Sequence, residues 1–346
     1  MIRIREVVVT GQRQVELREG ELDEALGPGE ILIETDCTFI SAGTELANYM
    51  ARDQGVFRPG NWCAYPWRSG YGNVGIVRAA GDGVSRVKVG QRVLSYGNHA
   101  SFVRYDAADR LVTPVPEGLE SGVAAASRMA GVAVTSIILA EIKGSPWVVV
   151  FGLGAVGNLA AQGFAARGCR VIGVDPVQER RALAERCGIA HTAGGTAAEV
   201  RARVREITGG AMAGIAIDAV GDSNVMREAL GAVAPFGQIV ILGSPRVAVE
   251  GNLTAMLADI HVRFLTVRGA LEWCLPMYPG PTPGVSQYEK QVMIFDWIAG
   301  DRLRLAPLIS HRVPPEKIKD AYEGLETDKG NFTGVVLDWK GGRSAG

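Results

Sequence analysis

The sequence predicts an α/β protein in which a β-rich part precedes an open, doubly wound parallel sheet. Residues 1–120 read as short strands separated by glycine and proline turns. From residue 121 helical stretches alternate with short, strongly apolar runs, and a Gly-x-Gly-x-x-Gly motif over residues 152–157 lies where one such run meets a helix. Repeated alternation of strand and helix is typical of a parallel sheet with helices on both faces.

The composition excludes several classes of function. The 346 residues include 36 Lys and Arg against 37 Asp and Glu, a formal net charge of −1, and no block of basic residues. Nucleic acids and anionic membranes bind concentrated positive charge, so neither is expected as a partner. No charge-free apolar run reaches the roughly 20 residues that span a bilayer, and the first strand carries Glu6, unlike a signal peptide. We therefore expect a cytoplasmic protein with a small-molecule substrate.

Glycine is abundant, whereas cysteine and histidine are scarce. The chain has 45 Gly, five Cys and four His; glycine thus makes up about 13% of the residues, where about 7% is usual. No two cysteines lie within four residues of each other, which excludes a zinc ribbon and a Cys-x-x-Cys redox pair. The chemistry is therefore expected at the glycines rather than at a metal ion.

The first 120 residues predict strands that tight turns connect. These strands are expected at residues 6–10, 15–17, 30–42, 75–80, 91–95 and 101–105. Residues 53–69 show no periodicity and contain Trp62 and Trp67, so they predict a long loop. Long loops in compact domains are usually functional.

From residue 121 the pattern predicts a helix at 121–140 and then alternating elements. Strands are expected at 147–151, 169–174, 214–220, 238–242 and 264–267, and helices at 158–167, 177–187, 197–208 and 224–234. A proline- and glycine-rich loop at 275–284 precedes a helix at 286–298, a short helix at 316–325 and a strand at 334–339, and 341–346 are expected to be disordered. The predicted divisions are 1–120, 121–285 and 286–346.

The glycine motif has the context of a dinucleotide-binding site. It follows a predicted buried strand, opens a predicted helix and precedes an acidic residue, Asp175, which lies 18 positions beyond the third glycine. The first glycine allows the tight turn, the second lets the backbone approach a pyrophosphate, and the third lets helix and strand pack closely. The cofactor-binding residues predicted in this region are Gly152, Leu153, Gly154, Ala155, Val156, Gly157, Asp175, Arg180 and Gly243.

Asp175 indicates which dinucleotide binds. A carboxylate at the end of the second strand accepts hydrogen bonds from a ribose 2′-hydroxyl and repels a 2′-phosphate, so it favours NAD over NADP. Arg180 lies five positions further on and is a candidate ligand of the cofactor. The alternative is that Arg180 and Arg181 are simply solvated on the following helix. A structural glycine turn without a cofactor is the alternative interpretation of the motif.

The order of these parts resembles the medium-chain dehydrogenase/reductase superfamily, in particular its polyol and sugar dehydrogenase branch, over nearly the whole chain. The resemblance rests on Gly29-Glu-Ile-Leu-Ile33, Gly70-Tyr-Gly-Asn-Val-Gly75, Val87-Lys-Val-Gly-Gln-Arg-Val93, Gly152 to Gly157 with Asp175, Ile217-Asp-Ala-Val-Gly221 and His311-Arg-Val-Pro314. It implies a Rossmann NAD-binding domain and a GroES-like catalytic domain, the latter formed by the N- and C-terminal parts. It also implies that cofactor and substrate meet between the two domains.

The chain departs from zinc-dependent members of this superfamily at each expected ligand. Those members have Cys-Gly-Thr-Asp where this chain has Ala42-Gly43-Thr44-Glu45, and Gly-His-Glu where it has Gly70-Tyr71-Gly72. The third ligand falls on Arg128, and the four-cysteine structural zinc loop has no counterpart. Alanine has no donor atom and arginine stays protonated. The resemblance therefore implies a site without zinc.

Without zinc, another group must stabilise the negative oxygen that develops during hydride transfer. Arg128 and Tyr71 fall at ligand positions, and they would supply a fixed charge and a transferable proton. The resemblance gives Thr44 a place in the proton relay, and Glu45 would hold Arg128 or act as a base. Three alternatives stay open: Ser41 to Glu45 as no more than a helix start, Tyr71 as a packed aromatic, and Arg128 in a surface salt bridge.

The sequence thus predicts a zinc-independent, NAD-dependent oxidoreductase that interconverts a secondary alcohol and a ketone on a sugar, cyclitol or polyol. Aromatic faces would pack on ring CH groups and charged groups would bind hydroxyls; the candidate substrate residues are Trp62, Trp67, Glu272 and Trp273. The family resemblance implies a homodimer or homotetramer in which sheet edges pair.

Three other functions stay open at this point. The first is reduction of quinones or enones with NADPH, which zinc-free members of the superfamily often carry out, although Asp175 argues against NADPH. A non-enzymatic dinucleotide-binding scaffold or sensor is another. The stretch Ser41 to Glu45 also resembles bacteriochlorophyllide-type dehydrogenases, which leaves a large planar substrate open. His99 and His261 receive no role.

Overall fold

The computed structural model describes residues 1–281 and 284–340, and in it the chain forms two compact units. Unit 1 comprises Met1–Arg128, Leu275–Ala299 and the described chain from Ile309 on; unit 2 comprises Met129–Cys274 and Gly300–Leu308. The sequence pattern puts the boundaries at 120 and 285 instead, where the periodicity changes. The segment 341–346 and two residues of the predicted 275–284 loop lie outside the described residues.

Unit 1 is the β-rich unit. Its first part contains β1 (Ile2–Gly11), β2 (Gln14–Leu22), β3 (Glu30–Phe39), α1 (Ala42–Tyr49), η1 (Gln54–Phe57), β4 (Trp67–Arg68), β5 (Asn73–Ala80), β6 (Arg92–Ser95), β7 (Phe102–Asp106), β8 (Val112–Pro114) and the start of α2 (Ser121–Leu139). Its C-terminal part contains α8 (Gln287–Ala299), β15 (His311–Val313), η4 (Pro315–Lys317), α9 (Ile318–Thr327) and β16 (Val335–Asp338).

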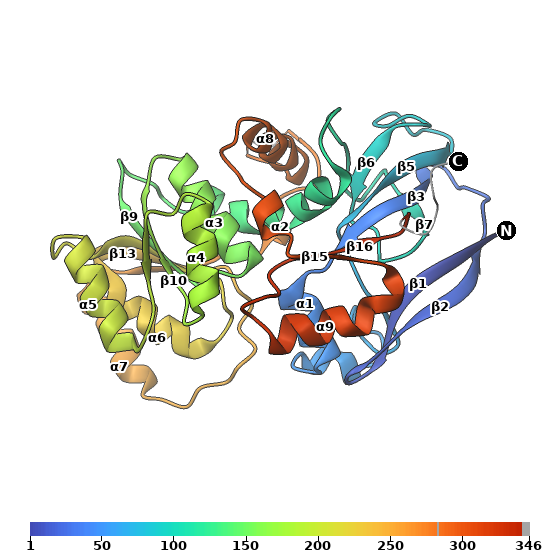
Figure 1. The fold of residues 1–346 in the computed structure, drawn as a ribbon. Helices are drawn as coiled ribbons and strands as arrows, with labels where there is room; N and C mark the ends of the chain where they lie inside the picture. The colour runs from blue at the N-terminus through green and yellow to red at the C-terminus, as the bar shows by residue number, and fades with distance from the viewer. Residues whose placement is uncertain (282–283, 341–346) are drawn as a thin grey trace. The chain divides into compact units, whose positions relative to one another are not determined.

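The C-terminal elements complete the sheet and the core of unit 1. The larger sheet has the order β15-β16-β3-β5-β6-β8 with β7 on β3, and a smaller one has the order β2-β1-β4. Thus β16 pairs antiparallel with β3, almost 300 residues earlier in the sequence, through Leu337 and Thr38. One core cluster joins Tyr49 of α1 to Tyr322 of α9, whose ring centroids lie 5.1 Å apart. Figure 1 shows the red C-terminal elements beside the blue N-terminal ones.

Unit 2 is an alternating α/β unit. It contains β9 (Trp147–Phe151), α3 (Ala155–Ala166), β10 (Arg170–Val174), α4 (Gln178–Arg186), β11 (His191–Ala193), α5 (Ala197–Ile207), β12 (Ala213–Asp218), α6 (Ser223–Ala232), β13 (Val233–Ile241), α7 (Leu253–Val262), β14 (Thr266–Gly269), η2 (Glu272–Cys274) and η3 (Ala306–Leu308).

The six strands of unit 2 form one parallel sheet in the order β11-β10-β9-β12-β13-β14. Counted from β9, this is the 3-2-1-4-5-6 order of a dinucleotide-binding Rossmann sheet. Val149 of β9 pairs with Ile172 on one side and Ala216 on the other, and all three are fully buried. Strands covered on both faces require such apolar runs. The predicted α/β class is confirmed, with a β-rich unit and a six-stranded parallel sheet.

Several local features differ from the sequence prediction, among them β4, β8 and β15, which are not predicted. The predicted strand 30–42 ends at Phe39, because the chain turns into α1 at Ala42. The short strand β11 and the helix α7 are not predicted by the sequence pattern. Helix α7 is apolar on several sides, with Met256 and Ile260 partly buried against the core and Leu253 and Leu257 exposed, so no single apolar face contrasts with a polar one.

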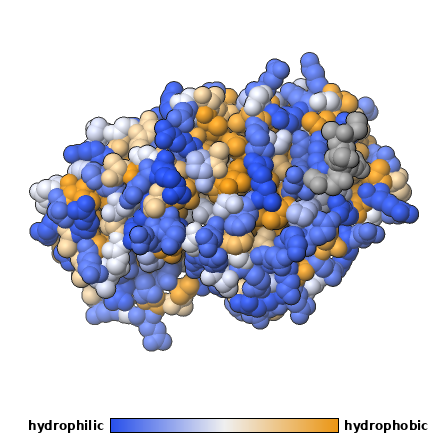
Figure 2. Space-filling model, in the orientation of Figure 1, coloured by the Kyte–Doolittle hydropathy of each residue, from blue (hydrophilic) through white to orange (hydrophobic). Residues whose placement is uncertain are grey.

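Helix α2 is long and apolar enough to cross a membrane by length and composition, but 78% of its apolar window is buried within the structure. It also carries the charged Arg128, which is fully buried. On the molecular face in Figure 2, hydrophobic and hydrophilic residues are interspersed. Helix α2 therefore has the character of a core helix.

Candidate functional site

Two hydroxyl groups of α1 lie against the predicted catalytic tyrosine in unit 1. Ser41 Oγ is in hydrogen-bonding contact with the Tyr71 hydroxyl, which also donates to Thr44 Oγ1 at 3.3 Å. Ser41 is the N-cap of α1, but its side chain makes no capping hydrogen bond. Its hydroxyl is instead directed to Tyr71. Ser41 to Glu45 therefore does begin a helix, but Ser41 does not cap it through its side chain, and Ser41 and Thr44 both direct their hydroxyls to Tyr71.

Arg128 lies beside this cluster. Its side chain is fully buried, and the guanidinium carbon lies 4.7 Å from the centroid of the Tyr71 ring and 4.1 Å from that of Tyr96. A guanidinium above an aromatic face is attracted by the ring's quadrupole, more strongly where water is excluded. The structure thus brings Arg128 and Tyr71 together, and the alternative of an exposed surface salt bridge is wrong. Tyr96 shares the cation, although no sequence motif marks it.

Glu45 is also fully buried, but it faces a different set of partners. Its Oε1 accepts the Ser41 backbone N–H at 2.8 Å. Its Oε2 lies 2.9 Å from His99 Nε2 and accepts the Tyr322 hydroxyl at 2.7 Å. Among the described residues, the carboxylate of Glu45 therefore binds Ser41, His99 and Tyr322 rather than Arg128. Burial and the neighbouring Glu45 raise the pKa of the Tyr322 hydroxyl well above its ordinary value, so Tyr322 stays protonated and donates.

The predicted aromatic substrate residues of unit 1 lie in the segment 53–69, which contains η1 and the short strand β4 rather than being a loop throughout. The Trp62 indole is 61% exposed, and its ring meets that of Trp67 edge-on at a centroid distance of 5.9 Å. Trp67 is buried in the core cluster of unit 1 and pairs with Val9 in the smaller sheet. Trp62 is therefore the member of this pair that offers a face to a ligand.

The glycine loop of unit 2 has the geometry that its sequence predicts. Gly152 has φ +86°, a conformation that favours glycine, and a Cβ on Gly157 would lie 1.8 Å from the Gly152 carbonyl oxygen. A Cβ on Gly154 would meet no atom closer than Arg180 Nη1, at 3.9 Å. Packing within the protein therefore requires glycine at positions 152 and 157, whereas position 154 has open space beside it.

Asp175 follows β10 and organises the same loop. Its Oδ2 accepts the Leu153 N–H at 2.7 Å and its Oδ1 accepts the Val177 N–H at 2.8 Å. Arg180 Nη1 lies 3.8 Å from Asp175 Oδ2, and burial lowers the pKa of that guanidinium although the carboxylate opposes the shift. Ala155 and Val156 open helix α3 directly beyond the loop. The structure thus brings Leu153, Asp175 and Arg180 together.

A second turn at the carboxyl edge of the sheet includes Gly243. The Gly243 N–H and the Leu242 N–H both bind the Asp218 carbonyl oxygen, at 2.7 and 2.8 Å. A Cβ on Gly243 would lie 2.5 Å from the Gly221 nitrogen, so the close approach of this turn to the loop after β12 requires glycine at position 243. Glu272 and Trp273 lie in η2 of unit 2, where Glu272 is buried and Trp273 is exposed.

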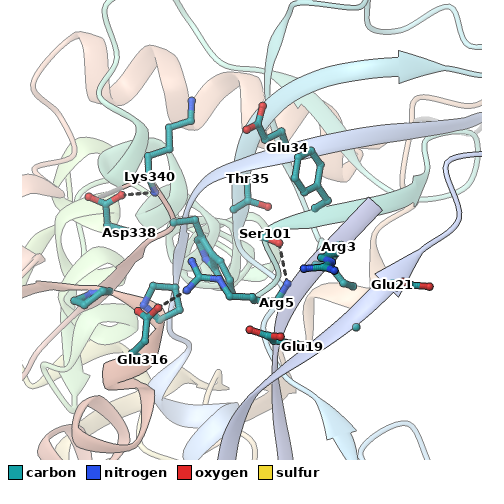
Figure 3. A pocket seen from close by; sticks show the side chains of 16 residues that line it. Arg3, Arg5, Glu19, Glu21, Glu34, Thr35, Ser101, Glu316, Asp338 and Lys340 are labelled. Carbon is teal, nitrogen blue, oxygen red and sulfur yellow. Dashed lines mark hydrogen bonds and ion pairs between the residues drawn. The ribbon is translucent and has the colours of Figure 1, made fainter. Parts of the chain in front are cut away.

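Unit 1 also has a hollow of about 740 Å³ between its two sheets (Figure 3). Arg5, Glu316, Asp338 and Lys340 are among its lining residues, and Arg5 forms an ion pair with Glu316. None of the predicted site residues lines it. The described residues contain no group of three or more His, Cys, Asp or Glu side chains that could hold a metal ion.

The chain was compared with known proteins. A family model described as zinc-binding dehydrogenase matches residues 155–276. An alcohol dehydrogenase of Rhizobium meliloti is 28% identical over 71% of this chain and 77% of its own. A Mycobacterium tuberculosis protein assigned by its name to the alcohol dehydrogenases is 26% identical over 96% of this chain and 98% of its own. The chain is a medium-chain dehydrogenase/reductase.

Further similarities of this dehydrogenase are with sugar- and polyol-related proteins. D-guloside 3-dehydrogenase of Escherichia coli is 26% identical over 72% of this chain and 76% of its own. The solved structure of galactitol-1-phosphate dehydrogenase from Escherichia coli has a TM-score of 0.80 at 20% identity and covers 96% of this chain and 99% of that one. The protein is therefore an oxidoreductase of the medium-chain alcohol dehydrogenase type with the fold of these enzymes.

The glycine loop yields a prediction that separates folding from ligand binding. Gly157→Ala is expected to lower the free energy of unfolding by about 2 to 3 kcal/mol, because the new Cβ overlaps the Gly152 carbonyl. Gly154→Ala is expected to leave stability unchanged but to weaken NADH binding about tenfold, which corresponds to about 1.4 kcal/mol. Chemical denaturation and NADH fluorescence titration measure the two effects. Equal stability losses in both variants would contradict this assignment.

Proposed function

We propose that this medium-chain dehydrogenase is a zinc-independent, NAD-dependent enzyme that interconverts a secondary alcohol and a ketone. The observation that carries the proposal is the cluster of Arg128, Tyr71, Ser41 and Thr44 in unit 1, which combines a buried positive charge with three linked hydroxyls. Bound NAD would accept a hydride from the carbinol carbon. The chain's own residues must then stabilise the substrate oxygen and remove its proton.

The residues at the family's zinc positions do not fit a zinc ion. Ala42 has no donor atom, and the Tyr71 hydroxyl is engaged with Ser41 and Thr44. Arg128 places a permanent positive charge beside the Tyr71 ring, where a second cation would be repelled. Zinc in proteins takes Cys, His and carboxylate ligands, and Glu45 already faces Ser41, His99 and Tyr322. The proposed mechanism therefore uses no zinc ion.

In the proposed mechanism Arg128 binds the substrate oxygen and stabilises the negative charge that develops on it. A positive group held away from water is worth more there than in solvent. Tyr71 donates to or accepts from the same oxygen, and Ser41 and Thr44 pass the proton onward through their hydroxyls. Each of these hydroxyls can both donate and accept a hydrogen bond, so each passes on one proton as it receives another, and the substrate proton leaves to solvent through the half-buried Thr44.

We assign the cofactor site to residues 152–157, Asp175, Arg180 and Gly243. The Asp175 carboxylate uses one lone pair on each oxygen for Leu153 and Val177, which leaves acceptor capacity for a ribose hydroxyl. The same negative charge disfavours a 2′-phosphate. Arg180 faces that carboxylate, so the positive charge of Arg180 is directed to Asp175 rather than to a phosphate. These features support NAD over NADP.

A sugar, cyclitol or polyol is the proposed substrate class. The exposed Trp62 face suits the CH groups of a sugar ring, and Glu272 and Trp273 are the proposed partners in unit 2. The similarity to D-guloside 3-dehydrogenase of Escherichia coli supports this class. We further propose a cytoplasmic location, in keeping with the balanced charge of the chain.

We also propose that the enzyme forms a homodimer, or a tetramer built from it, through the β14 edge of unit 2. This strand ends the six-stranded sheet, so its outer backbone groups have no strand partner within the described chain. Phe236 and Phe264 stack beside it at a centroid distance of 5.0 Å, and they are 76% and 66% exposed. Helix α7 adds the exposed Leu257. An apolar surface of this kind at a strand edge suits a second copy of the chain.

The role of Arg128 is tested by Arg128→Met on the alcohol that a substrate panel identifies. We expect kcat/KM to fall by about 10² to 10³, with NADH affinity unchanged, because only the stabilisation of the oxygen is lost. Arg110→Met is the matched control, since Arg110 also stacks on a tyrosine, Tyr105 at 4.6 Å, but lies on the surface. Turnover that is unaltered in Arg128→Met would remove the proposed role.

Cofactor preference is tested by titrating the protein with NADH and NADPH and following nicotinamide fluorescence. We expect NADH to bind at least about tenfold more tightly, because the Asp175 carboxylate repels the extra phosphate. Tighter binding of NADPH would contradict the proposal and favour the enone or quinone reductase alternative.

The self-association surface is tested by the double variant Phe236→Asp with Phe264→Asp. We expect light scattering after size exclusion to report a monomer, whereas the unaltered protein gives a dimer or tetramer. Phe57→Asp is the control, because Phe57 is 58% exposed but belongs to unit 1. The proposal fails if the double variant keeps the oligomeric mass of the unaltered protein.

A further inference from the structure

His99 is a fully buried histidine in unit 1 whose two ring nitrogens contact different elements. Nε2 lies 2.9 Å from Glu45 Oε2 on α1, and Nδ1 lies 2.7 Å from Thr38 Oγ1 on β3. Thr38 Oγ1 in turn accepts the Trp339 indole N–H at 3.1 Å. The ring therefore links helix α1 to the sheet through two side chains.

The donors and acceptors of this chain form a consistent sequence. Trp339 can only donate to Thr38, and the Thr38 hydroxyl is then free to donate to His99 Nδ1. The carboxylate of Glu45 only accepts, so His99 Nε2 carries the proton that points to it. The opposite Glu45 oxygen accepts the Ser41 N–H. With these roles His99 connects the sheet, through Glu45, to the N-cap residue of α1.

The same histidine also limits the segment that carries Tyr71. The His99 backbone N–H donates to the Ser69 carbonyl at 2.9 Å. Gly70 has φ +92°, and a Cβ there would lie 2.6 Å from the His99 ring and backbone nitrogen. Tyr322 connects the two sides again, because its hydroxyl contacts both Glu45 Oε2 and Ser69 Oγ.

From these contacts we infer that His99 is a positioning residue that sets the distance between the α1 hydroxyls and Tyr71. Through Glu45 it holds the start of α1, where Ser41 and Thr44 lie; through Ser69 and Gly70 it holds the segment that precedes Tyr71. This inference rests on the proposed function, in which those hydroxyls relay the substrate proton. His99 itself is buried and touches no reacting atom.

A residue of this kind affects the rate more than ground-state binding. Displacement of a catalytic group by about 1 Å can cost about 100-fold in rate. Cofactor affinity belongs to unit 2 and is expected to be independent of His99. Loss of His99 should therefore lower kcat while the affinity for NADH is retained.

The test compares His99→Leu with His99→Gln. Leucine has a similar size but cannot bind Glu45 or Thr38, whereas glutamine keeps a donor for Glu45. The readout that does not depend on activity is ¹⁹F NMR of protein labelled with 3-fluorotyrosine, in which Tyr71→Phe identifies the Tyr71 signal. Leu111→Ala is the control for lost packing, since Leu111 is fully buried in another part of the unit 1 core.

We expect His99→Leu to shift or broaden the Tyr71 signal and to lower kcat about 10- to 100-fold, with NADH affinity within about twofold. His99→Gln should recover a large part of the Tyr71 signal position and of kcat. Leu111→Ala should lower the Tm without moving the Tyr71 signal. The inference is overturned if the Tyr71 signal in His99→Leu is unmoved, or if Leu111→Ala at a similar Tm loses as much kcat.

Two further arms keep the result decisive. If His99→Leu does not fold, His99→Asn takes its place, because asparagine keeps a polar atom near the position of Nδ1 for Thr38 but is too short to reach Glu45. An unmoved Tyr71 signal in that variant also overturns the inference. If no alcohol is oxidised by the unaltered protein, the proposed function fails, whereas the ¹⁹F comparison still decides whether His99 positions Tyr71.

Discussion

The positive charge of Arg128, held without solvent exposure between two tyrosine rings, is the interaction on which the proposed site depends. Transfer of an ion out of water costs several kcal/mol, so a buried guanidinium persists only where nearby groups compensate it. The faces of Tyr71 and Tyr96 supply part of that compensation. In return the cation lies next to the Tyr71 hydroxyl cluster, where it can stabilise a developing negative oxygen.

The surroundings of this cation are built from segments that lie far apart in the sequence. Glu45, His99 and Tyr322 come from α1, from the segment between β6 and β7, and from α9, and they meet in one buried network. The pairing of β16 with β3 brings Trp339 to Thr38 and closes the same network. The C-terminal return into unit 1 thus contributes directly to the environment of the proposed catalytic helix.

Local chemistry explains what the sequence could predict. One βαβ segment contains a buried strand at 147–151, a turn that needs glycine at 152 and 157, and an acidic residue at 175. Each of these features has a local cause, so the sequence alone predicts them. Helix α7 is apolar on several sides, so its pattern does not distinguish a buried face from an exposed one. Tyr96, His99 and Tyr322 could not be assigned, because their partners are set by pairing between distant strands. The sequence predicts that Glu45 holds Arg128 or acts as a base, whereas the fold directs its carboxylate to His99.

The claim that a buried guanidinium takes the place of the metal is tested most directly by the zinc content of the active enzyme. The measurement is elemental analysis of protein purified from zinc-supplemented cells, with turnover recorded before and after treatment with a chelator. The account predicts far less than one zinc ion per chain and turnover that the chelator leaves intact. About one zinc ion per chain, with turnover lost on chelation and restored by added zinc, would contradict it.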